Sequence, residues 1–259
     1  MSYKDILVYL DPTPACDDRL GAAIDLARTF GARLLGADAS SDAAFTGEWR
    51  DRALQVGPIF EERTAAAKVG AKLVGAEAGP DGIFPDFAHC VDLLIAPRPE
   101  GRARELVLPF VPDVALMRAG APMLILPQEW RPAPIGRSVV IAWNASREAT
   151  RAVHDAMPFL KKAEKVVVFA FSAGPSGLRA SAEALVQHLE RHGVAAIVSD
   201  WTHTGDITAV EALFASLDTQ DADLVVAGAF GHSRAFEGLF GGVSLDLLRQ
   251  PSLPVLMSH

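Results

Sequence analysis

The stretch DLVVAGAFGHSRAFEGLFGGVSLDLLRQPSLPVLM, residues 223–257, decides the fold of this chain. Its aliphatic start, DLVVAG, is typical of a strand that is buried on both faces of a sheet. Several glycines follow, and after them come a helical pattern, VSLDLLRQ, and a second apolar run, PVLM. A strand, a glycine-rich loop, a helix and another strand in this order indicate parallel strands joined by a crossover helix.

The same alternation of strand and helix runs along the whole chain. DILVYL at 5–10 begins one series and SVVIAW at 138–143 begins another. Between them lies QEWRPAPIG at 128–136, a polar, proline-rich segment that indicates a linker. Asp92 in the first series aligns with Asp223 in the second, and the residues that begin at them match as DLLIA and DLVVA. The pattern indicates an internal duplication at the scale of a domain.

We therefore predict two repeated α/β domains of five parallel strands each, at residues 1–127 and 137–259. The alternative interpretation is one large doubly wound sheet, in which the two series would share a single core.

Composition argues against several classes of function. The 259 residues are 50% hydrophobic, and 24 basic against 32 acidic side chains give a net charge of -8. Nucleic acids and anionic membrane surfaces both attract basic patches, so we expect neither as a partner. We expect no signal peptide, since the first residues are polar and acidic; the sequence has no membrane-length apolar run, and its two cysteines are Cys16 and Cys90. These features predict a cytoplasmic protein without a disulfide framework.

The glycines of the opening stretch predict an anion site. Gly228 and Gly231 follow the predicted strand, whereas Gly241 and Gly242 precede the helix, whose first turn contains Ser244. Glycine lets the backbone approach a phosphate closely, and the N–H groups and dipole of a helix start attract an anion. We interpret the loop as a phosphate site; the alternative is that these are ordinary turn glycines.

Two enzyme classes with similar loops fit less well. A Walker A loop needs Gly-Lys before Ser or Thr, and the chain contains no Gly-Lys pair, which excludes a P-loop NTPase. GHSRA at 231–235 is one residue short of the hydrolase elbow G-x-S-x-G. Too few residues follow Ser233 to carry the acid and the histidine that such a nucleophile needs.

The glycine spacing resembles the G-x2-G-x9-G-[S/T] loop of the universal stress protein family, and the resemblance extends over nearly the whole chain as a tandem of two family domains. It implies the strand order 3-2-1-4-5 in each domain, with helices on both faces of the sheet. It also implies adenine-nucleotide binding at the switch between strands 1 and 4. The family pairs through its edge strand, so we expect the two domains to pack as an intramolecular pseudo-twofold dimer, with a homodimer as a further possibility.

Carried over residue by residue, the resemblance places the nucleotide site in the second domain. Asn144 stands where the family has an acid that meets the adenine, and its amide oxygen can accept from the adenine amino group. Gly242 replaces the hydroxyl residue expected after the third glycine, whereas Ser244 matches a second phosphate-contacting hydroxyl. The expected cofactor-binding residues are Asn144, Gly228, Gly231, Gly241, Gly242, Val243 and Ser244.

The first domain has Asp11 in the adenine-reading position but has lost the loop. The residues that align with the four glycines are Pro97, Glu100, Phe110 and Val111. Proline lacks a backbone donor, the larger side chains hinder close approach, and a carboxylate repels phosphate. We expect this domain to have a structural or regulatory role.

The sequence thus predicts a universal stress protein that binds ATP or another adenine nucleotide, with Mg²⁺ as a possible companion. We expect a stress sensor or binding module rather than an enzyme. The alternatives are a nucleotide-free interaction protein and a slow ATP hydrolase. His188 and His192 lie four residues apart on one predicted helix, but no third ligand is evident, and we expect no metal site. Cys16 is expected to be an ordinary thiol.

Overall fold

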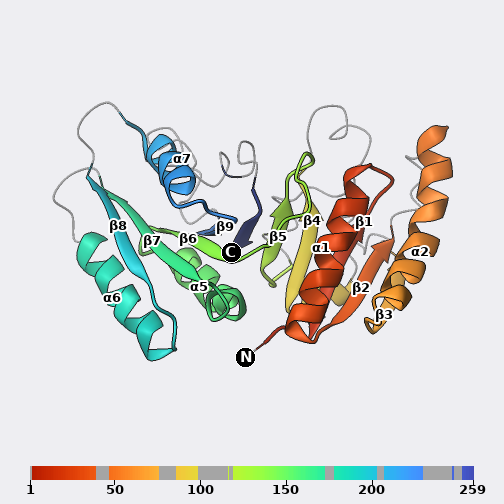
Figure 1. Ribbon diagram of the computed structural model, residues 1–259, viewed down its shortest axis with the longest axis horizontal. Coiled ribbons are helices and arrows are strands. Elements are labelled where there is room, and N and C mark those ends of the chain that lie inside the picture. The colour runs from red at the N-terminus through yellow and green to blue at the C-terminus, as the bar shows by residue number, and fades with distance from the viewer. Residues whose placement is uncertain are drawn as a thin grey trace. The chain divides into compact units, whose positions relative to one another are not determined.

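The computed structural model describes residues 2–38, 47–75, 86–98, 116, 119–172, 178–202, 207–229, 247 and 253–259. The chain divides into two compact units, Met1–Pro132 and Ala133–His259, which are coloured from red to green and from green to blue in Figure 1. The division falls within the proline-rich segment.

The first unit is a five-stranded parallel sheet with the strand order β3-β2-β1-β4-β5. Helices α1 and α2 cover one face of it (Figure 1). Its elements are β1 (Asp5–Leu10), α1 (Ala15–Phe30), β2 (Arg33–Asp38), α2 (Glu48–Ala66), β3 (Ala71–Gly75), the 3-10 helix η1 (Asp86–Cys90), β4 (Leu93–Pro97) and β5 (Met123–Leu126).

The second unit repeats this plan with the order β8-β7-β6-β9-β10, again with parallel pairs. Helices α5 and α6 lie on one face and α7 on the other (Figure 1), as right-handed crossovers require. Its elements are β6 (Ser138–Trp143), α5 (Arg147–Leu160), β7 (Lys165–Ser172), α6 (Leu178–Arg191), β8 (Ile197–Thr202), α7 (Ala209–Thr219), β9 (Leu224–Gly228) and β10 (Val255–Ser258).

Numbered within each unit, both orders read 3-2-1-4-5, which confirms the predicted fold class of repeated five-stranded α/β sheets. The central strands are almost wholly buried because they are aliphatic on both faces; Ile6, Val139 and Val225, for example, are 0% exposed. Pseudo-twofold packing of the two halves stays a prediction.

The match between Asp92 and Asp223 has a structural reason. The carboxylate of Asp92 accepts hydrogen bonds from the backbone N–H groups of Lys4 (2.7 Å) and Asp5 (3.0 Å), just ahead of β4. Asp223, just ahead of β9, accepts hydrogen bonds in the same way. Its donors are the backbone N–H groups of residues 136–138, at the start of β6, which lie 2.8, 3.1 and 3.2 Å from the carboxylate oxygens. In both units the aspartate ties the start of one central strand to the start of its neighbour.

Among the helices in the described ranges, none combines the length and the apolar character needed to cross a membrane.

Candidate functional site

The candidate site lies at the carboxyl ends of β6 and β9, which are neighbouring parallel strands in the second unit. Open parallel sheets bind ligands at such strand ends, where the connections leave in opposite directions. Asn144 follows β6 directly and its side chain is exposed, and Gly228 is the last residue of β9. The structure therefore brings the predicted adenine-reading residue to the same edge as the first predicted loop glycine.

Asn144 is held in place by a short turn. Its Oδ1 accepts a hydrogen bond from the backbone N–H of Ser146 over 3.1 Å, and Ala145 between them has a positive φ of 60°. Ser146 in turn caps α5, because its Oγ accepts from the N–H of Ala149 over 3.1 Å. An amide oxygen has two lone pairs, so Asn144 keeps one acceptor position and both N–H donors for a ligand.

Gly228 has a packing role of its own. A Cβ atom at this position would lie 2.4 Å from the backbone nitrogen of Ala149 and 2.6 Å from the carbonyl carbon of Glu148. The end of β9 thus passes so close to the first turn of α5 that only glycine fits. This reason holds with or without a phosphate, so Gly228 by itself does not distinguish a ligand loop from ordinary packing.

The remaining predicted ligand residues, Gly231, Gly241, Gly242, Val243 and Ser244, lie outside the described residues, as do Ser233 and Arg234. The phosphate-binding part of the site therefore stays a prediction from the sequence.

Glu148 is a charged residue at this edge that the sequence did not single out. Its side chain is 5% exposed and pairs with the guanidinium of Arg147. Burial opposes ionisation, but hydrogen bonds from Arg147 and from its own backbone N–H outweigh this effect and lower the pKa of the Glu148 carboxyl. The backbone and Cβ of Glu148 thus pack against the end of β9, and its ionised carboxylate pairs with Arg147. In the sequence, Glu148 was one more acid in a first helical turn, and only the packing against Gly228 reveals its position.

The carboxyl end of β1 in the first unit, which is equivalent to that of β6, has a buried acid in place of an exposed amide. Asp11 is 1% exposed, whereas Asn144 in the same place is exposed. Oδ1 of Asp11 accepts hydrogen bonds from the backbone N–H (2.9 Å) and from the hydroxyl of Thr13. Oδ2 of Asp11 lies 2.6 Å from Nη2 of Arg19. Arg19 also donates from Nε to the carbonyl oxygen of Tyr9 over 2.8 Å. Both carboxylate oxygens of Asp11 are thus engaged inside the unit.

Pro97 ends β4 in the place that Gly228 has in β9, and the two pair with the last residues of β5 and β10 respectively. The other residues aligned with the glycine loop, Glu100, Phe110 and Val111, lie outside the described residues.

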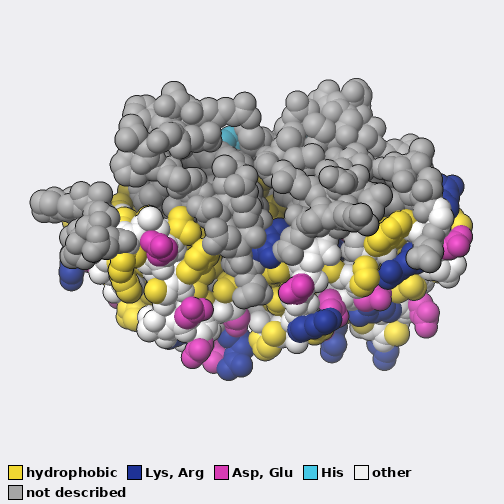
Figure 2. All heavy atoms as spheres, turned by 90° about the horizontal axis from the view of Figure 1, so that it is seen from above, with side chains coloured by type: hydrophobic (Ala, Val, Ile, Leu, Met, Phe, Trp, Pro, Cys, Tyr) yellow, Lys and Arg dark blue, Asp and Glu magenta, His cyan; other side chains and the backbone are white. Residues whose placement is uncertain are grey.

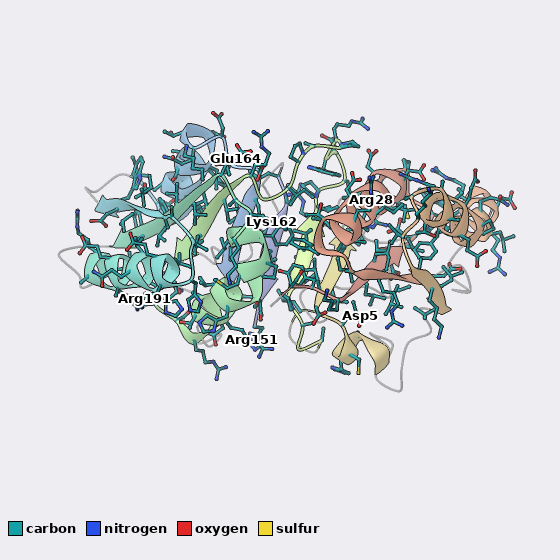
Figure 3. The ribbon with its side chains drawn as sticks, turned by 60° about the horizontal axis from the view of Figure 1, so that its bottom comes forward. Asp5, Arg28, Arg151, Lys162, Glu164 and Arg191 are labelled. Carbon is teal, nitrogen blue, oxygen red and sulfur yellow. The ribbon has the colours of Figure 1, made fainter. Side chains whose placement is uncertain are left out.

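Three histidines gather on the α5–α6 side of the second unit, where Figure 3 labels Arg151 and Arg191. The rings of His188 and His192 have centroids 4.6 Å apart, and His154 of α5 stacks on His188 at 5.8 Å. The sequence missed His154 because it belongs to another helix. As the side chains stand, the described part of the chain contains no group of three or more His, Cys, Asp or Glu residues arranged to hold a metal ion.

Charged side chains of both signs share the described surface. On the face shown in Figure 2, Lys and Arg are interspersed with Asp and Glu.

The sequence matches no protein-family model and no curated protein. Solved structures, however, share its fold. A universal stress protein from Archaeoglobus fulgidus DSM 4304 superposes with a TM-score of 0.70 at 16% identity, over 98% of this chain and 95% of its own. The chain has the universal stress protein fold.

Two further structures with this architecture come from Pseudomonas aeruginosa. A putative universal stress protein from strain UCBPP-PA14 has a TM-score of 0.62 at 17% identity, over 99% of this chain and 93% of its own. A functionally unknown protein from strain PAO1 also has a TM-score of 0.62, at 16% identity, over 99% of this chain and 92% of its own. The universal stress protein fold therefore accounts for both units of the chain.

Proposed function

We propose that this chain acts as a universal stress protein whose second unit binds one adenine nucleotide, with ATP as the first candidate. The contrast between two equivalent positions carries the proposal. Asn144 presents an exposed amide at the end of β6, whereas Asp11 at the end of β1 is buried and paired with Arg19. Of the two units, the second has the exposed side chain after its first strand and the glycine-rich sequence after its fourth strand.

Each group in this site would have a distinct task. The amide oxygen of Asn144 would accept a hydrogen bond from the adenine amino group. Backbone N–H groups of the loop that contains Gly231, Gly241 and Gly242 would hold the phosphates, assisted by Ser244 and the helix start beside it.

A binding role fits better than rapid turnover. The sequence from Gly228 to Gly242 contains one cationic side chain, Arg234, so little stabilises the charge on a transferred phosphoryl group. We expect any ATP hydrolysis to run well below ~1 s⁻¹, the low end of typical enzymes. Faster phosphate release that an Arg234→Ala change abolishes would instead support the hydrolase alternative.

Calorimetry of the full chain with ATP, ADP and AMP tests the proposal, together with mass spectrometry of nucleotide released from the denatured protein. We expect one site per chain. Gly241→Val should abolish binding by obstructing the loop, whereas Gly70→Val is the matched control, because nothing lies within 4 Å of a Cβ at Gly70.

Each other outcome points to a different conclusion. Two sites per chain, or full binding by Gly241→Val, would contradict the assignment of the site to the second unit. A lack of binding by the unmodified chain to all three nucleotides would contradict the proposal itself and favour a nucleotide-free interaction protein.

A further inference from the structure

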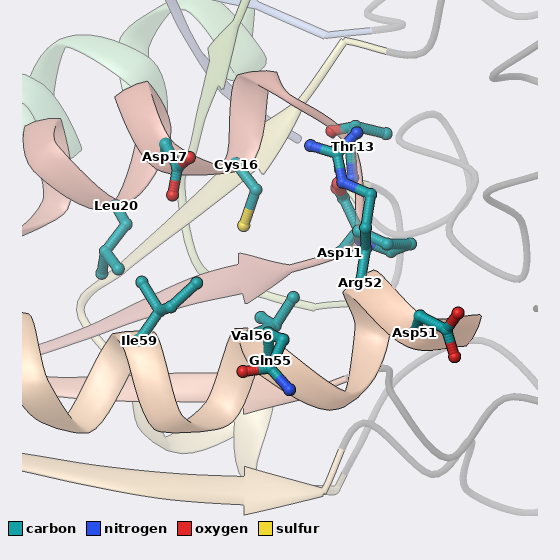
Figure 4. Close-up of a pocket in the computed structure, with 11 residues that line it drawn as sticks. Asp11, Thr13, Cys16, Asp17, Leu20, Asp51, Arg52, Gln55, Val56 and Ile59 are labelled. Atoms are coloured by element: carbon teal, nitrogen blue, oxygen red, sulfur yellow. Dashed lines mark hydrogen bonds between the residues drawn. The ribbon is translucent and has the colours of Figure 1, made fainter. Parts of the chain in front are cut away.

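The first unit contains a cavity that the nucleotide hypothesis does not use. It lies between α1 and α2, next to the carboxyl end of β1, and has a volume of about 320 Å³ (Figure 4). This volume is at the lower end of the ~300–1,000 Å³ that small-molecule sites occupy. A cavity of this size can accept a compact ligand with two or three rings.

The inner wall of the cavity is apolar. Cys16 and Leu20 extend from α1, and Val56 and Ile59 extend from α2 toward them (Figure 4). Cys16 and Leu20 are 7% and 2% exposed. Burial raises the pKa of the Cys16 thiol to about 11, so the sulfur is protonated and uncharged at neutral pH. The wall therefore favours apolar contact.

The polar groups deeper in the cavity have partners already. Asp11 and Thr13 line it beside the end of β1, but both oxygens of the Asp11 carboxylate accept hydrogen bonds within the unit. The positive charge of Arg19 offsets the negative charge of Asp11, because Nη2 of Arg19 lies 2.6 Å from Oδ2 of Asp11. A ligand that reaches this depth meets no uncompensated charge among the lining residues.

The mouth of the cavity has charged side chains of both signs. Asp17 and Asp51 contribute carboxylates and Arg52 a guanidinium, and Asp17 Oδ1 lies 3.8 Å from Nη1 of Arg63. The Arg52 guanidinium also lies over the ring of Trp49, with its central carbon 5.8 Å from the ring centroid. The charges at the rim therefore do not select the ligand; a phosphate or a carboxylate is disfavoured by the apolar wall, which offers no partner for a buried charge.

The packing of α2 keeps the cavity from collapsing. Phe60 is 1% exposed and packs on β2 at Gly36, where a Cβ atom would come within 2.9 Å of its ring. Arg63 bridges the helices by donating from Nη1 to the carbonyl oxygen of Asp17 over 2.8 Å. Because α2 is fixed both to the sheet and to α1, the space between Leu20 and Ile59 is preformed, which reduces the cost of binding.

We propose that the first unit binds a small, uncharged and predominantly apolar molecule between α1 and α2. The site is distinct from the proposed nucleotide site and does not depend on it. The unit that lacks the glycine loop would thus have its own ligand, which is uncharged and apolar, whereas a nucleotide is anionic and polar.

The two cysteines of the chain make the location testable. Cys16 lines the cavity and is buried, whereas Cys90 is exposed and lies elsewhere in the unit. Maleimide labelling at pH 8, read by peptide mass spectrometry, follows both thiols in one sample. The probe is N-phenyl-1-naphthylamine, which is uncharged, and its comparison is 8-anilino-1-naphthalenesulfonate, which has the same ring core with a negative charge.

We expect saturating naphthylamine to slow the labelling of Cys16 at least about fivefold and to leave that of Cys90 unchanged. The sulfonate at the same concentration should protect Cys16 much less. Equal protection by both probes, or by neither, would overturn the proposal, as would better protection by adenosine than by the naphthylamine.

A variant that fills the cavity provides the second test. Ile59→Trp should abolish the fluorescence increase of the naphthylamine, whereas Leu54→Trp should retain it, because Leu54 is 55% exposed on the same helix. Val56→Phe replaces Ile59→Trp if the melting curve shows that the latter does not fold. An unchanged fluorescence increase in a folded filling variant would contradict the site.

Discussion

Asp11 and Arg19 form an ion pair in the interior of the first unit. The Arg19 Nη2 and Asp11 Oδ2 atoms are 2.6 Å apart, and the two side chains are 2% and 0% exposed for Arg19 and Asp11 respectively. Removing two charges from water is costly, so such a pair contributes little net stability, but the loss of one partner leaves an uncompensated buried charge. Burial tends to lower the pKa of Arg19, but the charge of Asp11 outweighs this and raises it.

We therefore expect Asp11→Ala to lower the free energy of unfolding of the first unit by about 3–5 kcal/mol, the usual cost of breaking a buried pair. The double change of Asp11→Ala with Arg19→Met should cost less than Asp11→Ala alone, because it removes both charges. Urea unfolding curves of the three proteins measure these differences.

Asn144→Ala is the matched control, since Asn144 holds the equivalent position but is exposed. Its cost should stay below about 1 kcal/mol, the value of one exposed turn hydrogen bond. If Asp11→Ala lowers the free energy of unfolding no more than Asn144→Ala does, then removing Asp11 does not leave a costly unpaired charge on Arg19.

The repeated α/β plan could be predicted because its signals are local, whereas the strand order 3-2-1-4-5 was implied only by the family resemblance. Aliphatic runs mark the strands, and the alignment of Asp92 with Asp223 marks a repeated strand-start contact. The role of Asp11 could not be predicted in the same way. Its partner Arg19 resembles any other arginine of an amphipathic helix, and only the turn after β1 brings that side chain back to the end of the strand.

Gly228 shows a second limit of sequence reasoning. Glycine spacing indicated a ligand loop, but the requirement at this position comes from Glu148 and Ala149, far away in the chain. Gly228→Ala should therefore destabilise the second unit even when nucleotide is absent. We expect a loss of about 1–3 kcal/mol, the cost of overpacking against an atom that cannot move aside.

Gly70→Ala serves as the control for Gly228→Ala, because a Cβ there meets open space. Thermal melting without nucleotide should show that its free energy of unfolding lies within about 0.5 kcal/mol of that of the unmodified chain. Equal melting temperatures for Gly228→Ala and Gly70→Ala would show that the close approach of β9 to α5 is relieved at no cost.

The histidine cluster predicts sensitivity to acid. Burial lowers the pKa of the His188 imidazole, and the neighbouring rings and the Arg191 guanidinium lower it further. The unfolded chain then binds this proton more readily than the folded one, so stability is present above the ordinary histidine pKa and is lost as pH falls through the lowered value. His188→Gln should reduce the fall in melting temperature between pH 7 and pH 5.

His192→Gln should have the same direction of effect, because it removes one of the rings that repel a proton from His188. An unchanged acid response in both variants would show that the cluster does not govern the pH dependence.

Asn144 provides the sharpest test of how the second unit would recognise adenine. Asn144→Ala removes one hydrogen bond to the base, so ATP affinity should fall by about 0.5–1.5 kcal/mol, the net value of such a bond. Asn144→Asp retains a side-chain oxygen for both the Ser146 N–H and the adenine amino group, and it should bind nearly as well as the unmodified chain. Tripolyphosphate has no base, so its affinity should be equal in all three proteins if Asn144 acts on the adenine. A parallel loss of ATP and tripolyphosphate affinity in Asn144→Ala would instead show that the change acts through the loop.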